Sequence, residues 1–391
     1  MLLKLIKIFF LGQLVGLPTM KSILTKYDKS CQRQTDYANL CKSLSNSQIR
    51  SIFESVFEQY LIQEFSKMLK KHNCTWSREL TTVVLDDSVF MSWLGDQESF
   101  ETTADCYGKF FSGQFGKAVF GFQAVCLGVV IDKIYYPLYI ECARKPKKDE
   151  SAASKKEKGS KGVAIRLVQK WGKFYRLLHH KGMKIPQFCF SCDSGYSDKE
   201  LLKACADNFL HYISVPKKSH TFTKDGLTIK LNVMIDDFLK LEAAHLQAGG
   251  KSPFTYRNTA YYNCIEQEVV LLFFRLNGSK KVSVIYTVDL NIKAKTLRRN
   301  WFQRTYIEQY FKTLKHVLKI QEARTKTKHG FDFKLFRFSL IALHAQKLIR
   351  TIRKSIKGSI PIGFQTLQRL LSDDPNIKNL LNANLERPFA K

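Results

Sequence analysis

Acidic residues are scarce in this sequence. Its 391 residues contain 34 Asp and Glu against 63 Lys and Arg, which gives a formal net charge of +29 at pH 7. Such an excess of positive charge disfavours a cationic partner and indicates a polyanionic one, with nucleic acid as the default candidate. With 45% hydrophobic and 25% charged residues, the composition excludes a largely disordered chain and is typical of a globular protein of two or three domains.

Long apolar runs are also lacking. The strongest run, "MLLKLIKIFFLGQLVGL" at the start, is interrupted by lysines and is too short to span a bilayer. A signal peptide would require a small-residue cleavage site, which does not follow cleanly. We therefore expect an amphipathic first helix, no membrane partner and a cytoplasmic protein.

Clustered metal-binding motifs are missing as well. The ten cysteines are scattered, and the single CxxC pair, Cys189 and Cys192, has no second pair at zinc-finger spacing. None of the nine histidines forms an HExxH motif. This pattern predicts buried structural cysteines in a reducing compartment rather than a zinc centre.

Hydrophobic periodicity divides the chain into helical and β-rich parts. Residues 20–78 are predicted to be helical, and three sequential strands follow, the last two joined in a hairpin near Asp132-Lys133. The lysine-rich stretch 145–161 is predicted to be an exposed, flexible connection that could touch phosphate. A helix ending at Gly182, the strand "IPQFCFSC", a helix opened by a Ser197/Glu200 capping box and the strand "FLHYISV" come next.

The later part is predicted to change from β to helix. From Lys217 to Leu297 the pattern is mainly β, with "LTIKLNVMI", "NCIEQEVVLLFFRLN" and "KKVSVIYTVD" as its clearest strands. Helices resume with "WFQRTYIEQYFKTLK" and with a basic amphipathic segment near the end, and no internal repeat is visible. The predicted parts are a helical N-terminal region at 1–78, a catalytic core at 79–216 and 298–330, a β-rich insertion at 217–297 and a helical C-terminal region at 331–391.

Two acids follow buried strands of the predicted α/β core. Asp86 comes after "TTVVL" and Asp193 after "FCFSC", at the sheet edge where open α/β folds place their sites. Either residue alone is equally well explained as a turn former. With Glu308 as a third member, the carboxylates could hold two Mg²⁺ ions through oxygen ligands.

The helix that carries Glu308 gathers its charges on one side. At about 100° per residue, Trp301, Arg304, Glu308 and Lys315 fall within an arc of roughly 60° beside the apolar face. One explanation is a solvated face on which Arg304 and Glu308 form a surface pair. The other is one wall of an active site.

In fixed register, these four residues resemble the signature of DDE transposases of bacterial insertion sequences, of the insertion-sequence-four type. That signature is Tyr-x2-Arg-x3-Glu-x6-Lys, and Trp301 stands here in place of its Tyr. "DDS" at 86–88 is similar to the family's first Asp motif, and "CDSGYS" is similar to the setting of its second Asp. The long interval from Asp193 to Glu308 matches the family's β-rich insertion.

The resemblance implies an α/β, RNase H-like catalytic core interrupted by the β insertion. It implies that Asp86, Asp193 and Glu308 are the catalytic residues and the ligands of two Mg²⁺ ions, for which Mn²⁺ could substitute. Arg304, Lys315 and Trp301 would contact DNA. Asp87 remains an alternative to Asp86, because an alignment shifted by one residue would make it the ligand; strand alternation and the Asp-x-Ser spacing favour Asp86.

The activity that the resemblance implies is cut-and-paste transposition. A homodimer in a synaptic complex would cut double-stranded DNA at the terminal inverted repeats, pass through a hairpin intermediate and join the freed 3′-hydroxyls to target DNA. Such a protein would be cytoplasmic and associated with the bacterial nucleoid. Two alternatives remain: an RNase H-like nuclease without strand transfer, and a non-catalytic or domesticated DNA-binding relic. Within the insertion, Tyr261 and Tyr262 could stack on an unpaired base, although core packing explains them as well.

Overall fold

A computed structural model describes most of the chain. The described ranges are residues 46–71, 81–91, 106–113, 116–144, 149–251, 253–276, 279–321 and 328–355. The expected first amphipathic helix lies outside these ranges. Of the predicted helical C-terminal region at 331–391, the structure describes residues 331–355. Within them, no helix has the length and hydropathy that a membrane crossing requires.

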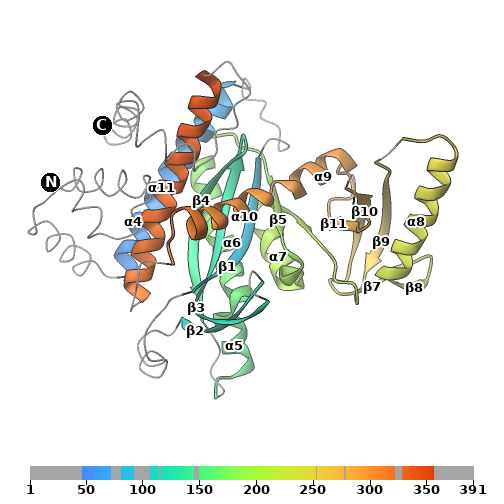
Figure 1. The fold of residues 1–391 in the computed structure, drawn as a ribbon, viewed down its shortest axis with the longest axis horizontal. Helices are drawn as coiled ribbons and strands as arrows, with labels where there is room; N and C mark the ends of the chain where they lie inside the picture. The colour runs from blue at the N-terminus through green and yellow to red at the C-terminus, as the bar shows by residue number, and fades with distance from the viewer. Residues whose placement is uncertain are drawn as a thin grey trace, which may run out of the picture.

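A single mixed sheet organises the described residues (Figure 1). Its core strands are β1 (Thr81–Met91), β3 (Lys117–Ile131), β4 (Ile134–Ala143), β5 (Phe188–Cys192) and β6 (Leu210–Ser214). They lie in the order β4-β3-β1-β5-β6; β1, β3 and β4 pair antiparallel, whereas β1, β5 and β6 pair parallel. This order and these directions are those of an RNase H-like core, as predicted. The short strand β2 (Tyr107–Ser112) pairs with the first part of β3.

Helices cover both faces of the core sheet. One face carries α4 (Asn46–Lys71), α6 (Ser160–His180) and α7 (Lys199–Asp207), and the other carries α10 (Thr305–Lys312) and α11 (Lys328–Ser355). Along β1, Val83 and Leu85 pack toward the first face and Val84 toward the second. Burial on both faces explains why the β1 sequence begins as a continuous apolar run rather than an alternating one.

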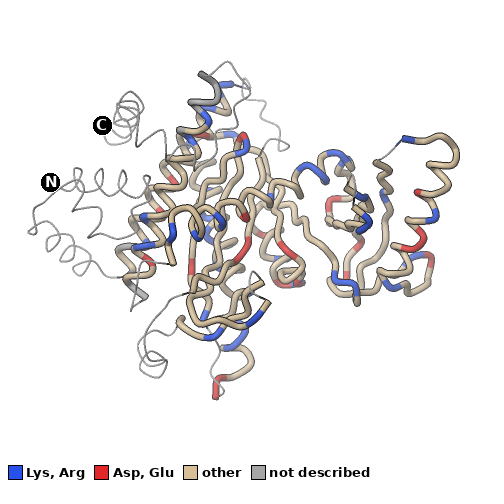
Figure 2. The backbone as a smooth tube through the Cα atoms, viewed as in Figure 1, with Lys and Arg blue, Asp and Glu red and all other residues tan. Residues whose placement is uncertain are grey.

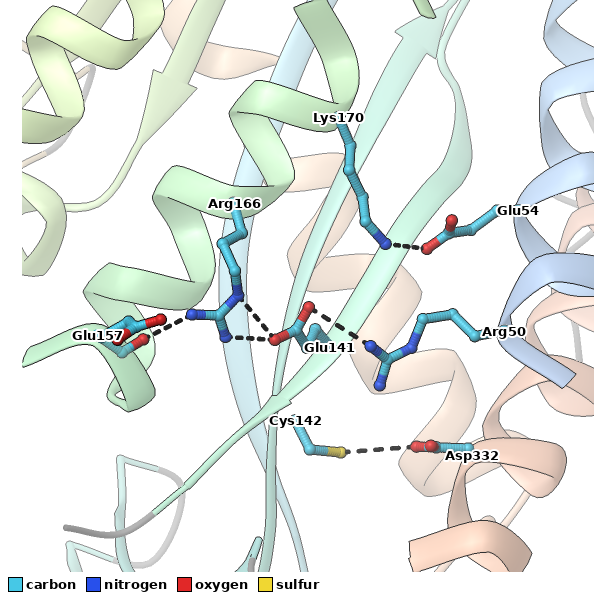
Figure 3. Close-up of polar contacts among 8 residues, drawn as sticks. All are labelled: Arg50, Glu54, Glu141, Cys142, Glu157, Arg166, Lys170 and Asp332. Atoms are coloured by element: carbon cyan, nitrogen blue, oxygen red, sulfur yellow. Dashed lines mark hydrogen bonds and ion pairs between the residues drawn. The ribbon is translucent and has the colours of Figure 1, made fainter. Parts of the chain in front are cut away.

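Charged pairs fasten the outer helices to the core (Figure 3). Glu141 of β4 accepts from Arg166 of α6 at 3.0 Å, and its other oxygen lies 3.6 Å from Arg50 of α4. Lys170 of α6 pairs with Glu54 of α4. These contacts join α4 to the same sheet that carries the site.

The segment predicted to be mainly β continues the same sheet and also contains a helix. Its strands are β7 (Thr221–Lys224), β8 (Leu227–Lys230), β9 (Thr255–Tyr262), β10 (Gln267–Arg275) and β11 (Val282–Thr287), and β11 pairs with β6. The predicted strand "LTIKLNVMI" is wrong beyond Lys230, because α8 (Leu231–Gln247) begins there. Its buried residues Leu231, Met234 and Phe238 have helical spacing, which becomes visible only when the sequence is followed past Ile235.

Local chemistry confirms some predicted boundaries and corrects others. The hairpin turns at Asp132 and Lys133, whose φ angles are 52° and 67°, as predicted. The stretch predicted to be a flexible connection instead holds α5 (Ala152–Lys158) and the start of α6, because the Ser151 side chain caps α5 by accepting from the Ser154 N–H. The predicted capping box is also wrong, since Asp198 caps α7 and the Ser197 hydroxyl donates to the Val215 carbonyl.

Candidate active site

The pairing of β1 with β5 brings two of the predicted acids together. The parallel register runs from Thr82↔Cys189 to Leu85↔Cys192, so Asp86 and Asp193 are the next residues on adjacent strands. Neighbouring strands lie about 4.8 Å apart. Asp86 is not at the end of its strand as predicted, because β1 continues to Met91 along β3. The pairing of β1 with β5, however, ends at Leu85 and Cys192, one residue before the two aspartates.

Asp87 is held by two side chains that do not hydrogen-bond to Asp86. Its Oδ1 accepts from the Tyr196 hydroxyl at 2.7 Å, and its Oδ2 accepts from the Gln123 side-chain amide at 2.7 Å. Tyr196 belongs to the 3₁₀ turn Ser194–Tyr196 that follows Asp193. Asp87 therefore links β1, β3 and the Asp193 loop, and both of its oxygens are engaged.

The segment predicted to be one helix is broken just before Glu308. The helix α9 (Ala294–Phe302) ends, a turn follows at 303–304, α10 begins at Thr305, and a π-helical turn covers Thr313–Val317. Buried Asn300 anchors α9: its Oδ1 accepts from the Thr82 hydroxyl at 2.8 Å, and its Nδ2 donates to Cys189 Sγ at 3.1 Å. After the turn, α10 packs against β1 and β4.

Arg304 lies in this turn and joins two of the predicted catalytic acids. Its Nη1 is 3.3 Å from Asp86 Oδ2, and its Nη2 is 2.8 Å from Glu308 Oε1. The other Asp86 oxygen accepts from the Asp87 backbone N–H at 2.9 Å. Arg304 thus connects Asp86 of β1 with Glu308 of α10, and the Glu308 side chain stays 39% exposed.

The electrostatics of Asp86 follow from this crowding. Burial raises the pKa of Asp86 to about 7; Arg304 lowers it, and the neighbouring carboxylates of Asp87 and Asp193 raise it further. A carboxylate in such surroundings is stabilised by an additional cation.

The remaining two members of the motif lie beside the same site. The Lys315 ammonium is 5.3 Å from the centre of the Phe90 ring, and burial lowers its pKa to about 8, against an opposing influence of Asp87. The Trp301 ring is half-buried, with the Arg304 guanidinium 5.0 Å from its centre. The Trp301 ring therefore stabilises the position of the Arg304 guanidinium through a cation–π contact.

The chemistry of the three carboxylates suits a hard divalent cation, although they do not form a ready-made cage. Mg²⁺ prefers anionic oxygen ligands, which Asp86, Asp193 and Glu308 would supply. Among the described residues, no three His, Cys, Asp or Glu side chains are grouped closely enough to hold a metal ion. Arg304 pairs with Asp86 and Glu308. A bound metal ion would compensate the negative charge of these carboxylates in place of the guanidinium.

Three residues of the site were missed from sequence: Gln123, Tyr196 and Asn300. Tyr196 stands within "CDSGYS" and could have been noticed as the polar end of that motif. Gln123 is one polar residue in a long apolar strand, a visible but unspecific signal. Asn300 directly precedes the Trp301 motif, and only the packing of α9 on β1 and β5 reveals its role.

With this geometry established, comparison with known proteins becomes informative. Residues 187–343 match the family model of the transposase DDE domain. The match supports a DDE transposase. It covers less than half of the chain, runs from the residue before β5 into α11, and includes Asp193 and Glu308.

Two further comparisons add little. No curated protein matches this chain. Among solved structures, the chain is similar to the NurA nuclease from Sulfolobus solfataricus, with 11% sequence identity, a TM-score of 0.25, and coverage of 79% of this chain and 99% of that chain.

Proposed function

We propose that this protein is a cut-and-paste DNA transposase of the insertion-sequence-four type. The observation that carries the proposal is the position of Asp86, which the strand register puts next to Asp193 and which contacts Arg304, the partner of Glu308. The match of residues 187–343 to the transposase DDE domain supports it independently of that geometry. The net charge of +29 suits a DNA partner.

Asp86, Asp193 and Glu308 would hold two Mg²⁺ ions. Asp86 is the first ligand in this proposal rather than Asp87, because Tyr196 and Gln123 already engage both oxygens of Asp87. When bound, such ions activate a water or a 3′-hydroxyl and stabilise the leaving oxygen in an in-line displacement.

The cations of the motif would bind and orient the DNA strand. Arg304 pairs with two carboxylates and would donate to a phosphate beside the cleaved bond once the metals neutralise those acids. Lys315 would contribute a second positive charge next to Phe90. Trp301 would hold the Arg304 guanidinium in place through its ring.

The rest of the chain would assemble the complex. Two copies would bring the two ends of the element together, with residues 1–78 aiding end binding and residues 217–297 extending the sheet beside the site. Each active site would hydrolyse one strand, form and reopen a hairpin, and join the 3′-hydroxyl to target DNA. The protein would act in the cytoplasm, on the bacterial nucleoid.

The test uses linear DNA that carries the inverted repeats flanking the gene, a supercoiled target plasmid and Mg²⁺. We expect nicks at the repeat ends, hairpin-ended fragments and insertion products joined to the plasmid. Cleavage without joined products would identify a nuclease that lacks strand transfer. Binding without cleavage would identify a non-catalytic relic.

A further inference from the structure

An open groove lies between α9 and the start of β9, away from the carboxylates. Its volume is about 520 Å³. Three cationic side chains, an aromatic ring and two small residues line it, namely Lys295, Arg298, Arg299, Phe302, Thr255 and Ala294. Figure 1 shows α9 connecting α10, which crosses the core, with the part of the sheet formed by β9, β10 and β11.

The charged side chains that line the groove are all cationic, namely Lys295, Arg298 and Arg299, and the stretches of sequence around the lining residues are also free of acids. Residues 251–265 and 290–307 contain no Asp or Glu. They contain seven Lys and Arg, namely Lys251, Arg257, Lys293, Lys295, Arg298, Arg299 and Arg304. Figure 2 shows Lys and Arg gathered along α9. A concave surface lined by one sign of charge concentrates counterions of the other sign.

Two aromatic rings fix the position of Arg298 in the groove. The Arg298 guanidinium lies 5.0 Å from the centre of the Phe274 ring and 5.8 Å from that of Phe302. The two rings pack edge to face with centres 5.9 Å apart. Phe274 pairs with Thr255 in the sheet, so Arg298 rests on a rigid support. A guanidinium fixed in this way loses little freedom when it binds a phosphate.

The groove also has a fixed relation to the candidate active site. Asn300 ties α9 to β1 and β5, the two strands that carry the aspartates. Ten residues separate Arg298 from Glu308, and because the turn at 303–304 interrupts the helix between them, their separation along the chain path is at most about 15 Å, the rise of an unbroken helix of that length. A DNA strand held at the carboxylates would reach this distance within about four base pairs, at 3.4 Å each.

We propose that this groove binds the sugar-phosphate backbone of duplex DNA a few base pairs from the cleaved bond, with Lys295 and Arg298 as its phosphate ligands. The inference rests on the proposed function, since it takes the same DNA as the partner. It adds a second point of attachment, outside the motif of Arg304 and Lys315, that fixes the direction in which the duplex leaves the active site. Both contacts are independent of base sequence.

The test is equilibrium binding of a fluorescein-labelled duplex of random sequence, in EDTA, over a series of KCl concentrations. The variant Lys295→Gln/Arg298→Gln removes two cations from the groove. The matched control Lys173→Gln/Arg176→Gln removes two exposed cations from α6, on the opposite face of the sheet, and Arg176 also stacks on a ring, that of Phe209.

We expect the groove variant to lower the slope of log K against log salt by about 1.8, since each phosphate contact contributes about 0.9. Affinity at low salt should fall about tenfold or more, while the control keeps the wild-type slope. Because Arg298 is partly buried, Lys295→Glu provides a second variant at an exposed position, and it should weaken binding as well. Wild-type slopes in both groove variants would overturn the groove assignment and leave the proposed function standing. Failure of the wild-type protein to bind any duplex would instead overturn the proposed function.

Discussion

Arg304 joins Asp86 to Glu308, through a hydrogen bond to Asp86 at 3.3 Å and an ion pair with Glu308 at 2.8 Å. These residues lie 218 and 4 positions from Arg304 in the sequence, and the turn between α9 and α10 is what brings them together. The guanidinium compensates part of the negative charge of these two acids. Its own position is fixed by the Trp301 ring behind it.

Asp86 and Asp87 are expected to respond differently to the same substitution. Asp86→Asn should abolish Mg²⁺-dependent DNA cleavage, because a neutral amide is a poor ligand for Mg²⁺. Asp87→Asn should retain most of the activity, with a stability loss of about 1–2 kcal/mol from weakened hydrogen bonds to Tyr196 and Gln123. Cleavage assays and denaturant unfolding of both variants measure this. Loss of cleavage in a folded Asp87→Asn protein and its survival in Asp86→Asn would reverse the assignment.

Replacing Arg304 should affect both charge compensation and DNA binding. Arg304→Ala removes the cation that lowers the pKa of Asp86, so that pKa rises and Asp86 stays protonated to higher pH. The acid limb of the pH–rate profile should therefore move to higher pH, and kcat should fall about 100-fold. Arg304→Lys keeps the charge and should restore part of the rate and the original limb. An unchanged profile in Arg304→Ala would contradict this role.

Asn300 is expected to matter through the position of α9. Asn300→Ala leaves the buried Thr82 hydroxyl and the Cys189 thiol without this partner, which should lower the free energy of unfolding by about 2 kcal/mol. Cleavage should fall more than DNA binding, since α10 carries Glu308 and is aimed by α9. Thr82→Val, which removes the hydroxyl instead, serves as the comparison and should be milder. Equal stability of the wild type and Asn300→Ala would show that the contact is unimportant.

Acid should loosen the packing of α4 on α11 through His344. His344 Nε2 shares a hydrogen bond with the Tyr60 hydroxyl at 2.8 Å, and burial together with the Lys347 charge lowers the pKa of His344 from 6.5 to about 4. The folded state resists protonation, so the stabilisation is complete above pH 6.5 and is lost as the pH falls toward 4. The loss is up to about 3 kcal/mol, at 1.36 kcal/mol per pKa unit.

The variant His344→Gln tests this dependence because it keeps an acceptor for Tyr60 but cannot be protonated. Between pH 7 and about 4, the free energy of unfolding should depend less on pH for the variant than for the wild type. If the free energy of unfolding of the variant fell with pH as steeply as that of the wild type, other groups would be responsible for the acid sensitivity.

The sheet and its acids were predictable because each left a continuous signal in the sequence. The apolar runs before Asp86 and Asp193 indicated strands buried on both faces, and parallel pairing then placed the two acids side by side. The spacing from Trp301 to Lys315 was visible as a motif, and two of its cations contact β1, Arg304 at Asp86 and Lys315 at Phe90.

The unpredicted features depend on contacts between distant segments. Nothing in the periodicity of "WFQRTYIEQYFKTLK" marks the turn at 303–304, because the apolar spacing continues through it; the turn follows from the anchoring of Asn300 on β1 and β5. Both Ser197 and Asp198 are good caps for α7, and the bond from Ser197 to Val215 on a neighbouring segment decides between them. In the same way, Tyr196 and Gln123 reveal which of two adjacent aspartates faces the site.

The most direct test of the central claim is the cleavage of DNA carrying the element ends by wild-type protein and by Glu308→Ala, in Mg²⁺ and in EDTA. We predict that the wild type cuts in Mg²⁺ and not in EDTA, and that Glu308→Ala binds the same DNA with little loss but does not cut it. Cleavage of these ends by folded Glu308→Ala protein at the wild-type rate would contradict the account.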